Sequence, residues 1–238
     1  MVVGGAAGPS GAQAGAGETG CVTLPSGECV DAKGCAAGER RDVIVDSKGK
    51  VVDVVCYPAS SAPPVVDSQG DVTLDKTQNN GVVAADGADD GVDIAGNVTA
   101  AGNNVVVYGE GPAVSVIGGN VTATGNNFAM RGVTVKGNVE IVGNGAALVL
   151  CVIEGNVRVQ GNNAVIAVCD VLGNIVLEGN NHTLVANHVG GSITVTDSQN
   201  LVCDGNRAWS DANSNKLFED GEAGAPIAGS GSSRGGGK

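Results

Sequence analysis

Aromatic residues are scarce in this chain: they make up 2% of its 238 residues. Hydrophobic residues nonetheless make up 42%, mostly Val, Ala, Ile and Leu, and the chain also contains 40 glycines. This composition excludes a disordered chain, because disordered segments contain few β-branched residues. It indicates many short strands separated by turns.

Long apolar runs and positive charges are also scarce. No apolar run approaches the roughly 20 residues that a membrane-spanning helix needs, so we expect no such segment. Lys and Arg number 13 against 25 Asp and Glu, which gives a net charge of -12. A negative field repels nucleic acids and anionic membranes, so neither is expected as a partner.

Groups suited to catalysis are few. His182 and His188 lie in one repeat, and no serine or cysteine motif accompanies them. A polysaccharide-cleaving enzyme would need paired carboxylates along a cleft. Glu140, Arg158 and Glu178 fall at outward positions of successive repeats and are the candidates for such a cleft. The same three residues are equally explained as a ladder of complementary charges.

A repeat with an 18-residue period occupies most of the chain and predicts a solenoid. Its coils begin at Gly70, Gly96, Gly119, Gly137, Gly155, Gly173 and Gly191. Insertions lengthen the first two coils, and one of them is an acidic stretch that contains Asp86, Asp89, Asp90 and Asp93. We interpret that stretch as a solvated loop, with a divalent-cation site as the alternative.

Stacking the coils gives columns of apolar residues that predict three short strands per coil around a common interior. The third column reads Val121, Val139, Val157, Ile175, Ile193, and the fifth reads Ala123, Ile141, Val159, Leu177, Val195. The twelfth reads Met130, Leu148, Ile166, Leu184, Val202, and the seventeenth reads Val135, Ile153, Val171, Val189 before Arg207 interrupts it.

An asparagine column predicts hydrogen bonding from coil to coil. It reads Asn126, Asn144, Asn162, Asn180 and then Ser198. Asparagine tolerates left-handed backbone angles, and stacked amides can bond to one another. The predicted fold is therefore all-β, a three-sided parallel β-helix. We expect the right-handed form, because the left-handed hexapeptide type needs an apolar residue every six positions.

Four cysteines, Cys21, Cys29, Cys35 and Cys56, lie in a segment too poor in apolar residues to hold a core alone. They predict two disulfides of undetermined connectivity in a small module with a β-hairpin around residues 47–50, and an oxidising compartment. A zinc site is the alternative. The expected organisation is a flexible tail over 1–20, the cysteine module over 21–58, a linker over 59–69, the β-helix over 70–208, a cap over 209–222 and a flexible tail over 223–238.

Stretches such as GNVTAAGNNVVVYG and GNIVLEGNNHTLVANH resemble a bacterial family of unknown function whose Gly-Asn-Asn β-helices occur in secreted proteins and lipoproteins. The short coils are also similar to those of bactofilins, which are polymerising β-helical scaffolds. The first resemblance implies fold but no catalytic residues, because its motifs are structural turns. The second implies self-assembly.

The segment SDANSNKLFEDGE is the candidate metal site. Oxygen ligands recur there with the spacing of a calcium-binding loop: Asp211, Asn213, Asn215, the Leu217 carbonyl, Glu219 and Glu222. Lys216 occupies the position where such loops have glycine, and a solvated acidic tail is the alternative. We expect structural calcium. Trp209, Leu217 and Phe218 are expected to cover the open end of the solenoid.

The remaining cysteines are Cys151, Cys169 and Cys203. The first two lie one period apart in an inward column and are expected to be buried free thiols. Cys203 is expected to be free or to pair with another chain.

The function expected from these features is that of a non-catalytic structural or surface β-solenoid, located in the extracellular space, the periplasm or at the cell surface, and self-assembling into filaments or a matrix. One alternative is a polysaccharide-binding or polysaccharide-cleaving β-helix that contacts surface glycans. Another is an ice-binding solenoid, although its threonine array, Thr73, Thr99, Thr122 and Thr194, is interrupted by Glu140, Arg158 and Val176.

Overall fold

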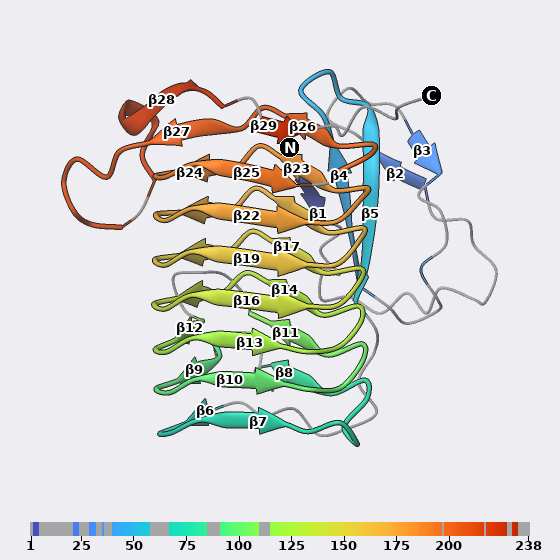
Figure 1. The fold of residues 1–238 in the computed structure, drawn as a ribbon, viewed down its shortest axis with the longest axis vertical. Helices are drawn as coiled ribbons and strands as arrows, with labels where there is room; N and C mark the ends of the chain where they lie inside the picture. The colour runs from blue at the N-terminus through green and yellow to red at the C-terminus, as the bar shows by residue number, and fades with distance from the viewer. Residues whose placement is uncertain are drawn as a thin grey trace.

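The computed structural model of the chain describes residues 2–4, 21–23, 29–31, 35, 40–57, 67–84, 91–109, 115–196, 198–216, 218–227 and 230–232. Within these ranges the regular structure consists of short strands and one turn of 3-10 helix, η1 (Asp220–Glu222). Strands from successive coils stack into three long sheets (Figure 1), which confirms the predicted parallel β-helix.

Each coil contributes one strand to each sheet. The first sheet contains β7 (Val72–Leu74), β10 (Val98–Ala100), β13 (Val121–Ala123), β16 (Val139–Val142), β19 (Val157–Gln160), β22 (Ile175–Glu178), β25 (Ile193–Thr196) and β29 (Ser230–Ser232). The second contains β8 (Val82–Ala84), β11 (Val106–Tyr108), β14 (Ala129–Arg131), β17 (Ala147–Val149), β20 (Val165–Ala167), β23 (Thr183–Val185) and β26 (Val202–Asp204). The third contains β6 (Asp67–Ser68), β9 (Asp93–Ile94), β12 (Val116–Ile117), β15 (Thr134–Val135), β18 (Val152–Ile153), β21 (Asp170–Val171), β24 (His188–Val189), β27 (Arg207–Trp209) and β28 (Ala223–Pro226).

Neighbouring coils pair in parallel and in register, as Val139 does with Val157. In Figure 1 the chain runs from left to right along the first sheet, turns behind into the second and returns through the third while it rises, which is a right-handed coil. The glycines that begin the coils stack closely. A Cβ at Gly155 would lie 2.5 Å from the carbonyl oxygen of Gly137, so a larger residue cannot be placed there without a shift of the backbone.

The predicted inward columns form the core, and residues such as Ile141, Leu148 and Ile153 are fully buried. The last coil differs from the prediction. Cys203, not Val202, pairs with Leu184, and Ala208, not Arg207, pairs with Val189. The turn after β25 is one residue longer than the turns after the earlier strands of the first sheet. Each later residue therefore aligns one column before the one that the 18-residue period predicts. Arg207 therefore pairs with the outward His188 and leaves the inward column unbroken.

Asparagines form three ladders that link the coils. In the first, Asp71, Asn97, Asn120, Asn138, Asn156, Asn174 and Ser192 succeed one another at the start of each coil. The second, which we name the corner ladder, contains Asn79, Asn103, Asn126, Asn144, Asn162, Asn180 and Gln199. Gln199 takes the place predicted for Ser198, because the turn after β25 is one residue longer. The third, the left-handed ladder, contains Asn80, Asn104, Asn127, Asn163, Asn181 and Asn200, all with φ between 56° and 62°.

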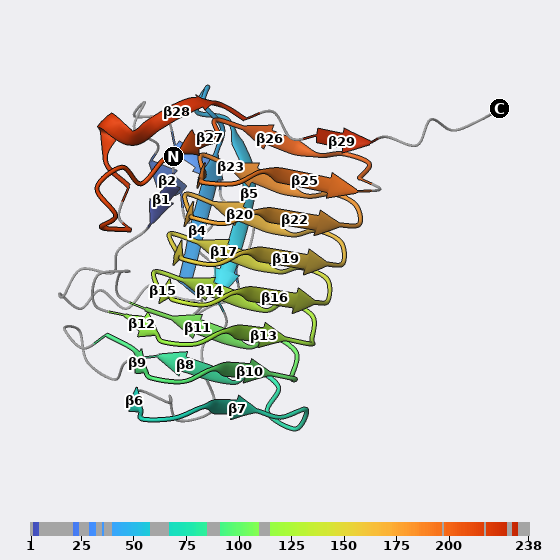
Figure 2. The same cartoon turned by 60° about the vertical axis from the view of Figure 1, so that its left-hand side comes forward.

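A hairpin of β4 (Arg40–Val45) and β5 (Val51–Tyr57) lies along the second sheet across several coils, as Figures 1 and 2 show. Its turn is stabilised by a hydrogen bond from Gly49 N to Asp46 O (3.0 Å), close to the predicted position. Ile44, Val55 and Tyr57 pack on the outer face of the second sheet, against residues such as Ala147 and Val165. This sheet is therefore buried on both faces, and the predicted cysteine module is joined to the solenoid rather than separated from it.

The two ends of the solenoid differ. At the C-terminal end β28 pairs antiparallel with β27, β29 pairs with β25, and Ile227 packs against the core. In the described part of the chain, β6, β7 and β8 are the last strands of their sheets at the N-terminal end. The β-helix begins at β6, inside the predicted linker. β1 (Val2–Gly4) pairs with β4, and β2 (Cys21–Thr23) pairs with β3 (Cys29–Asp31).

Candidate functional site

The predicted metal loop follows β27 and folds back against the third sheet. Lys216 Nζ lies 2.6 Å from Glu154 Oε2. Glu154 lies two coils before His188, which also contacts the loop. The ring of Phe218 stacks on the ring of His188 at 3.4 Å with an angle of 5° between the planes. The loop is therefore fixed to the outer face of the solenoid by an ion pair and an aromatic contact.

Within the loop, the candidate ligands bond to one another and to the backbone. Asp211 accepts hydrogen bonds from the backbone N–H groups of Asn215 (3.1 Å) and Lys216 (3.0 Å). Asn213 Oδ1 accepts from Asn215 N (3.0 Å), and Glu219 Oε1 accepts from Asn215 Nδ2 (2.9 Å). Leu217 lies outside the described residues.

Glu222 closes the loop. Its Oε2 accepts from Trp209 Nε1 (3.0 Å), and its Oε1 accepts from the backbone N–H of Ala212 (2.9 Å). The hydrogen bond from Trp209, followed by those from the backbone, lowers the pKa of Glu222. Trp209 is 4% exposed and packs edge-on against Phe218, which lies on His188 at the outer face of the third sheet. That these residues cover the open end of the solenoid stays a prediction.

Protein donors already bond to both oxygens of Glu222, so a calcium ion at this position would share these oxygens with the donors or displace them. Within the described ranges, no three His, Cys, Asp or Glu side chains are grouped closely enough to hold a metal ion. A calcium ion would therefore depend on the amide oxygens of Asn213 and Asn215 as well as on Asp211 and Glu219. Calcium binding stays a prediction.

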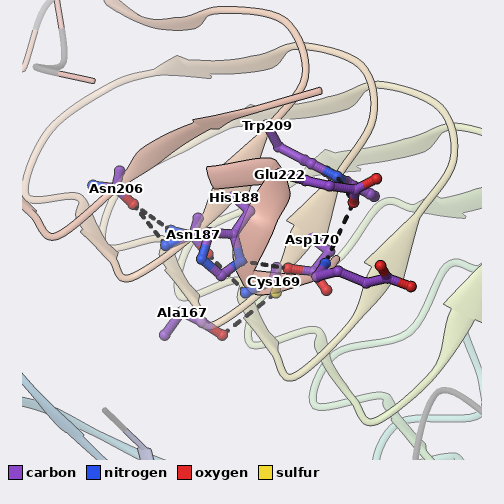
Figure 3. Close-up of polar contacts among 9 residues, drawn as sticks. Ala167, Cys169, Asp170, Asn187, His188, Asn206, Trp209 and Glu222 are labelled. Carbon is purple, nitrogen blue, oxygen red and sulfur yellow. Dashed lines mark hydrogen bonds and ion pairs between the residues drawn. The ribbon is translucent and has the colours of Figure 1, made fainter. Parts of the chain in front are cut away.

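Beside the cap, His188 Nδ1 lies 2.7 Å from Asp170 Oδ1, and both side chains are about three-quarters buried (Figure 3). The pair stands one above the other in neighbouring coils, because Asp170 and His188 are register partners. Serine and cysteine nucleophiles need such an oriented histidine. In this protein the histidine ring faces Phe218, which gives the pair a packing role under the cap.

Figure 3 also shows an interior contact that the sequence analysis missed. Asn187 and Asn206 follow Cys151 and Cys169 in one stacked column and are 0% and 2% exposed. Asn187 Nδ2 donates to Asn206 Oδ1 (2.8 Å) and to Ile166 O (2.9 Å), and Asn206 Nδ2 donates to Leu184 O (3.0 Å). Both amides are paired, so they tie the last coils together. Asn187 lies one period after Cys169, and this spacing in the sequence could have indicated that its side chain points into the interior.

The cysteines fall into two groups. Cys35 and Cys56 form a disulfide, one of the pairings that the predicted framework allowed. Cys21 and Cys29 lie on the paired strands β2 and β3, and their side chains lie outside the description. Cys151 and Cys169 are buried free thiols, as expected, and each donates to a backbone carbonyl. Cys203 is also free and partly buried.

Two of the three outward residues proposed for a polysaccharide cleft form an ion pair, and the third, Glu140, is the register partner of Arg158. Arg158 Nη2 lies 2.7 Å from Glu178 Oε1, and Gln160 Nε2 donates to Glu178 Oε2 (2.9 Å). The hydrogen bond from Gln160 and, to a smaller extent, that from Arg158 lower the pKa of Glu178. A general acid needs a raised pKa, so this environment does not suit Glu178 to that role. Asp93 lies on β9, whereas Asp86, Asp89 and Asp90 lie outside the described residues.

A groove that the sequence did not predict runs between β5 and the left-handed ladder, with a volume of about 500 Å³. Asp53 and Val54 line one side, and asparagines of the ladder line the other. It results from the hairpin packing across the coils and leaving their corners uncovered.

Comparisons of the chain with protein-family models, curated proteins and solved structures found no match. The resemblance to the Gly-Asn-Asn repeat family and to bactofilins therefore stays a prediction. In the part of the chain that the structure describes, no helix has the length and hydropathy needed to cross a membrane.

Proposed function

We propose that this protein is a non-catalytic structural β-solenoid that acts outside the cytoplasm as a rigid rod. The observation that supports this most is that the recurring polar side chains along the rod pair with their counterparts in neighbouring coils. The asparagine ladders, the Arg158–Glu178 pair and the Asp170–His188 pair all join one coil to the next. Such pairing stabilises stacked coils and gives a stiff repeat array.

The Cys35–Cys56 disulfide supports a location outside the cytoplasm, because disulfides persist in oxidising compartments. Alkylation of the protein in its native cells, before lysis, tests this location. We expect mass spectrometry to find Cys35 and Cys56 unmodified. Alkylated Cys35 and Cys56 in the native protein would contradict the proposed compartment.

The different ends of the solenoid favour single rods or pairs of rods over filaments. A head-to-tail filament needs two complementary open ends, and β28 and β29 cover the C-terminal one. At the N-terminal end, the exposed Asp71 and Asp75 flank β7, and charge at an edge strand opposes further pairing. Because the C-terminal end is covered, we propose that self-association is limited to pairs through the N-terminal end, and that the charge of these two aspartates keeps such pairs weak.

Negative-stain electron microscopy of the non-reduced protein, with calcium and with a chelator, tests the proposal. We expect short uniform rods in both conditions, alone or joined in pairs. Long filaments would show that the covered end opens, and calcium-dependent filaments would assign the loop at 211–222 to a junction. Polysaccharide cleavage that is lost in Glu140→Gln or Glu178→Gln would replace the structural role with an enzymatic one.

A further inference from the structure

The groove beside β5 combines an apolar floor with polar walls. Ala129, Ala147 and Val165 of the second sheet form the floor and are each less than 8% exposed. Asp53 stands on the hairpin side, where Thr183 Oγ1 and the backbone N–H of Val54 donate to its carboxylate. Burial, partly offset by these hydrogen bonds, raises the pKa of Asp53. The opposite wall is the left-handed ladder.

The left-handed ladder has a fixed direction, because each Nδ2 donates to the Oδ1 of the coil before it. The distances are 2.9 Å from Asn104 to Asn80, 2.8 Å from Asn127 to Asn104, 3.1 Å from Asn181 to Asn163 and 2.9 Å from Asn200 to Asn181. One coil interrupts the series. Gly145 occupies the position between Asn127 and Asn163, inside the groove.

The backbone at Gly145 follows the same path as at the ladder asparagines, so this position lacks only the side-chain amide. Gly145 has φ of 71°, close to the angles of the asparagines, and its N–H donates to Asn162 O (2.8 Å) as Asn163 N does to Asn180 O (2.9 Å). Asn127 Oδ1 leans over Gly145, into the place where a Cβ would lie. Among the described residues, no group donates to Asn127 Oδ1 and none accepts from Asn163 Nδ2.

We propose that this gap binds the acetamido group of an N-acetylated amino sugar. Adjacent strands are about 4.8 Å apart, so an amide placed midway between Asn127 and Asn163 is one ladder step from each. In a trans secondary amide the N–H and C=O point in opposite directions. The sugar amide therefore donates to Asn127 Oδ1 and accepts from Asn163 Nδ2, which completes the ladder.

The rest of the groove fits the rest of such a ligand. The acetyl methyl group contacts the floor at Ala129 and Ala147, and ring hydroxyls reach the carboxylate of Asp53. Sites of this kind combine apolar contact with a few placed polar groups. The gap is the space that one side-chain amide would fill, so its occupant must be an amide that ends in a small group such as a methyl. A peptide backbone, which continues on both sides of each amide, does not meet this requirement.

The inference does not depend on the structural role proposed above and is tested by binding alone. Isothermal titration calorimetry of the full chain would use a β-1,4-linked N-acetylglucosamine tetramer as the probe. The glucosamine tetramer without acetyl groups and the cellulose tetramer serve as matched controls. We expect at least tenfold weaker binding of both controls. Equal binding of the three sugars, or no binding of the acetylated one, would overturn the proposal.

Gly145→Asn is the decisive variant, because it supplies the missing amide from the protein itself. Its φ suits asparagine, and the flexible Asn127 side chain has only to turn back to the geometry of the other steps. We expect at least tenfold weaker sugar binding with an unchanged or raised melting temperature. Undiminished binding by the folded variant would contradict the site.

Asn163→Ala and Asn200→Ala form a second, matched pair. Both variants break one contact with Asn181, but only Asn163 lines the groove. We expect weaker sugar binding for Asn163→Ala and wild-type binding for Asn200→Ala. Equal losses in the two variants would show that ladder stability, not the gap, controls binding.

Discussion

Asp42 in the hairpin and Arg131 in the solenoid meet in a largely buried ion pair, with Arg131 Nε 2.7 Å from Asp42 Oδ2. Tyr57 donates to the same oxygen (2.8 Å), and Arg131 lies over the ring of Tyr108. Burial, followed by the charge of Asp42, raises the pKa of Tyr57. Burial alone would lower the pKa of Arg131, but the hydrogen bond and charge of Asp42 outweigh it and raise that pKa. The cluster fastens the hairpin to the second sheet.

Arg131→Ala is therefore expected to lower the free energy of unfolding by about 3–5 kcal/mol, because it leaves the carboxylate of Asp42 buried without its counter-ion. Urea unfolding measures the loss, and limited proteolysis should show earlier cleavage in the hairpin. Lys216→Ala is the control, since the Lys216 side chain is 52% exposed and such pairs contribute little. Similar losses in the two variants would contradict the role assigned to Arg131.

The corner ladder makes a second prediction. Asn162→Ala removes the hydrogen bond from Asn162 Nδ2 to Asn144 Oδ1 (3.0 Å) and the acceptor of Asn180 N (2.9 Å). We expect a loss of about 1–3 kcal/mol in the free energy of unfolding. Asn162→Asp should lose at least as much, because its carboxylate still accepts from Asn180 N but places a second acceptor oxygen against Asn144 Oδ1. A smaller loss for Asp than for Ala would contradict this account.

His182 should make stability depend on pH. It is fully buried, accepts a hydrogen bond from Ala164 N (3.3 Å) at Nδ1, and has no partner for Nε2 among the described residues. Burial lowers its pKa below the usual 6.5, so the unfolded chain binds a proton more readily than the folded one. Stability is therefore complete above pH 6.5 and declines as the pH falls below it.

Urea unfolding of the wild type and of His182→Leu between pH 7.5 and pH 5 tests this dependence. We expect a decline in the wild type below pH 6.5 and a flatter profile in the variant, whatever its absolute stability. Parallel profiles would show that another group controls this range.

The cap can be followed through Trp209, the one tryptophan of the chain. Glu222→Ala removes the acceptor of the indole N–H, so the fluorescence of Trp209 should shift to longer wavelength as water enters.

If calcium binds at 211–222, calcium raises the melting temperature of the wild type and leaves that of Asp211→Ala unchanged. A titration without any change in the wild type would exclude the predicted calcium site.

The disulfide makes the last prediction. Cys35 and Cys56 are separated by 21 residues, and closure of such a loop stabilises a protein by about 3 kcal/mol. The paired variant Cys35→Ser with Cys56→Ser should lose about that amount in urea unfolding. Cys203→Ser is the control, because Cys203 is free in the structure and its loss should have a small effect.

The sequence predicted the solenoid well because the determinants of a stacked coil recur locally. Each inward residue meets its counterpart one period away, as Leu148 meets Ile166, so the spacing alone identifies the core. The same spacing misplaced the last coil. Residue insertions leave no apolar signal of their own, and the longer turn before Asn200 shifted Val202 and Arg207 out of the predicted columns.

The sequence by itself thus determined the period, the strands, one of the three asparagine ladders and the inward faces of all but the last coil. The tertiary structure alone decided where the hairpin and the cap attach. Asp42 reaches Arg131 across 89 positions, Ser47 reaches Asp204 across 157, and Lys216 reaches Glu154 across 62. These contacts have no period, because they join a non-repeating segment to one face of a repeat. The groove arises from that attachment, so it becomes visible only in three dimensions, whereas the missing amide is already present in the sequence as Gly145 in place of the second asparagine of Gly-Asn-Asn.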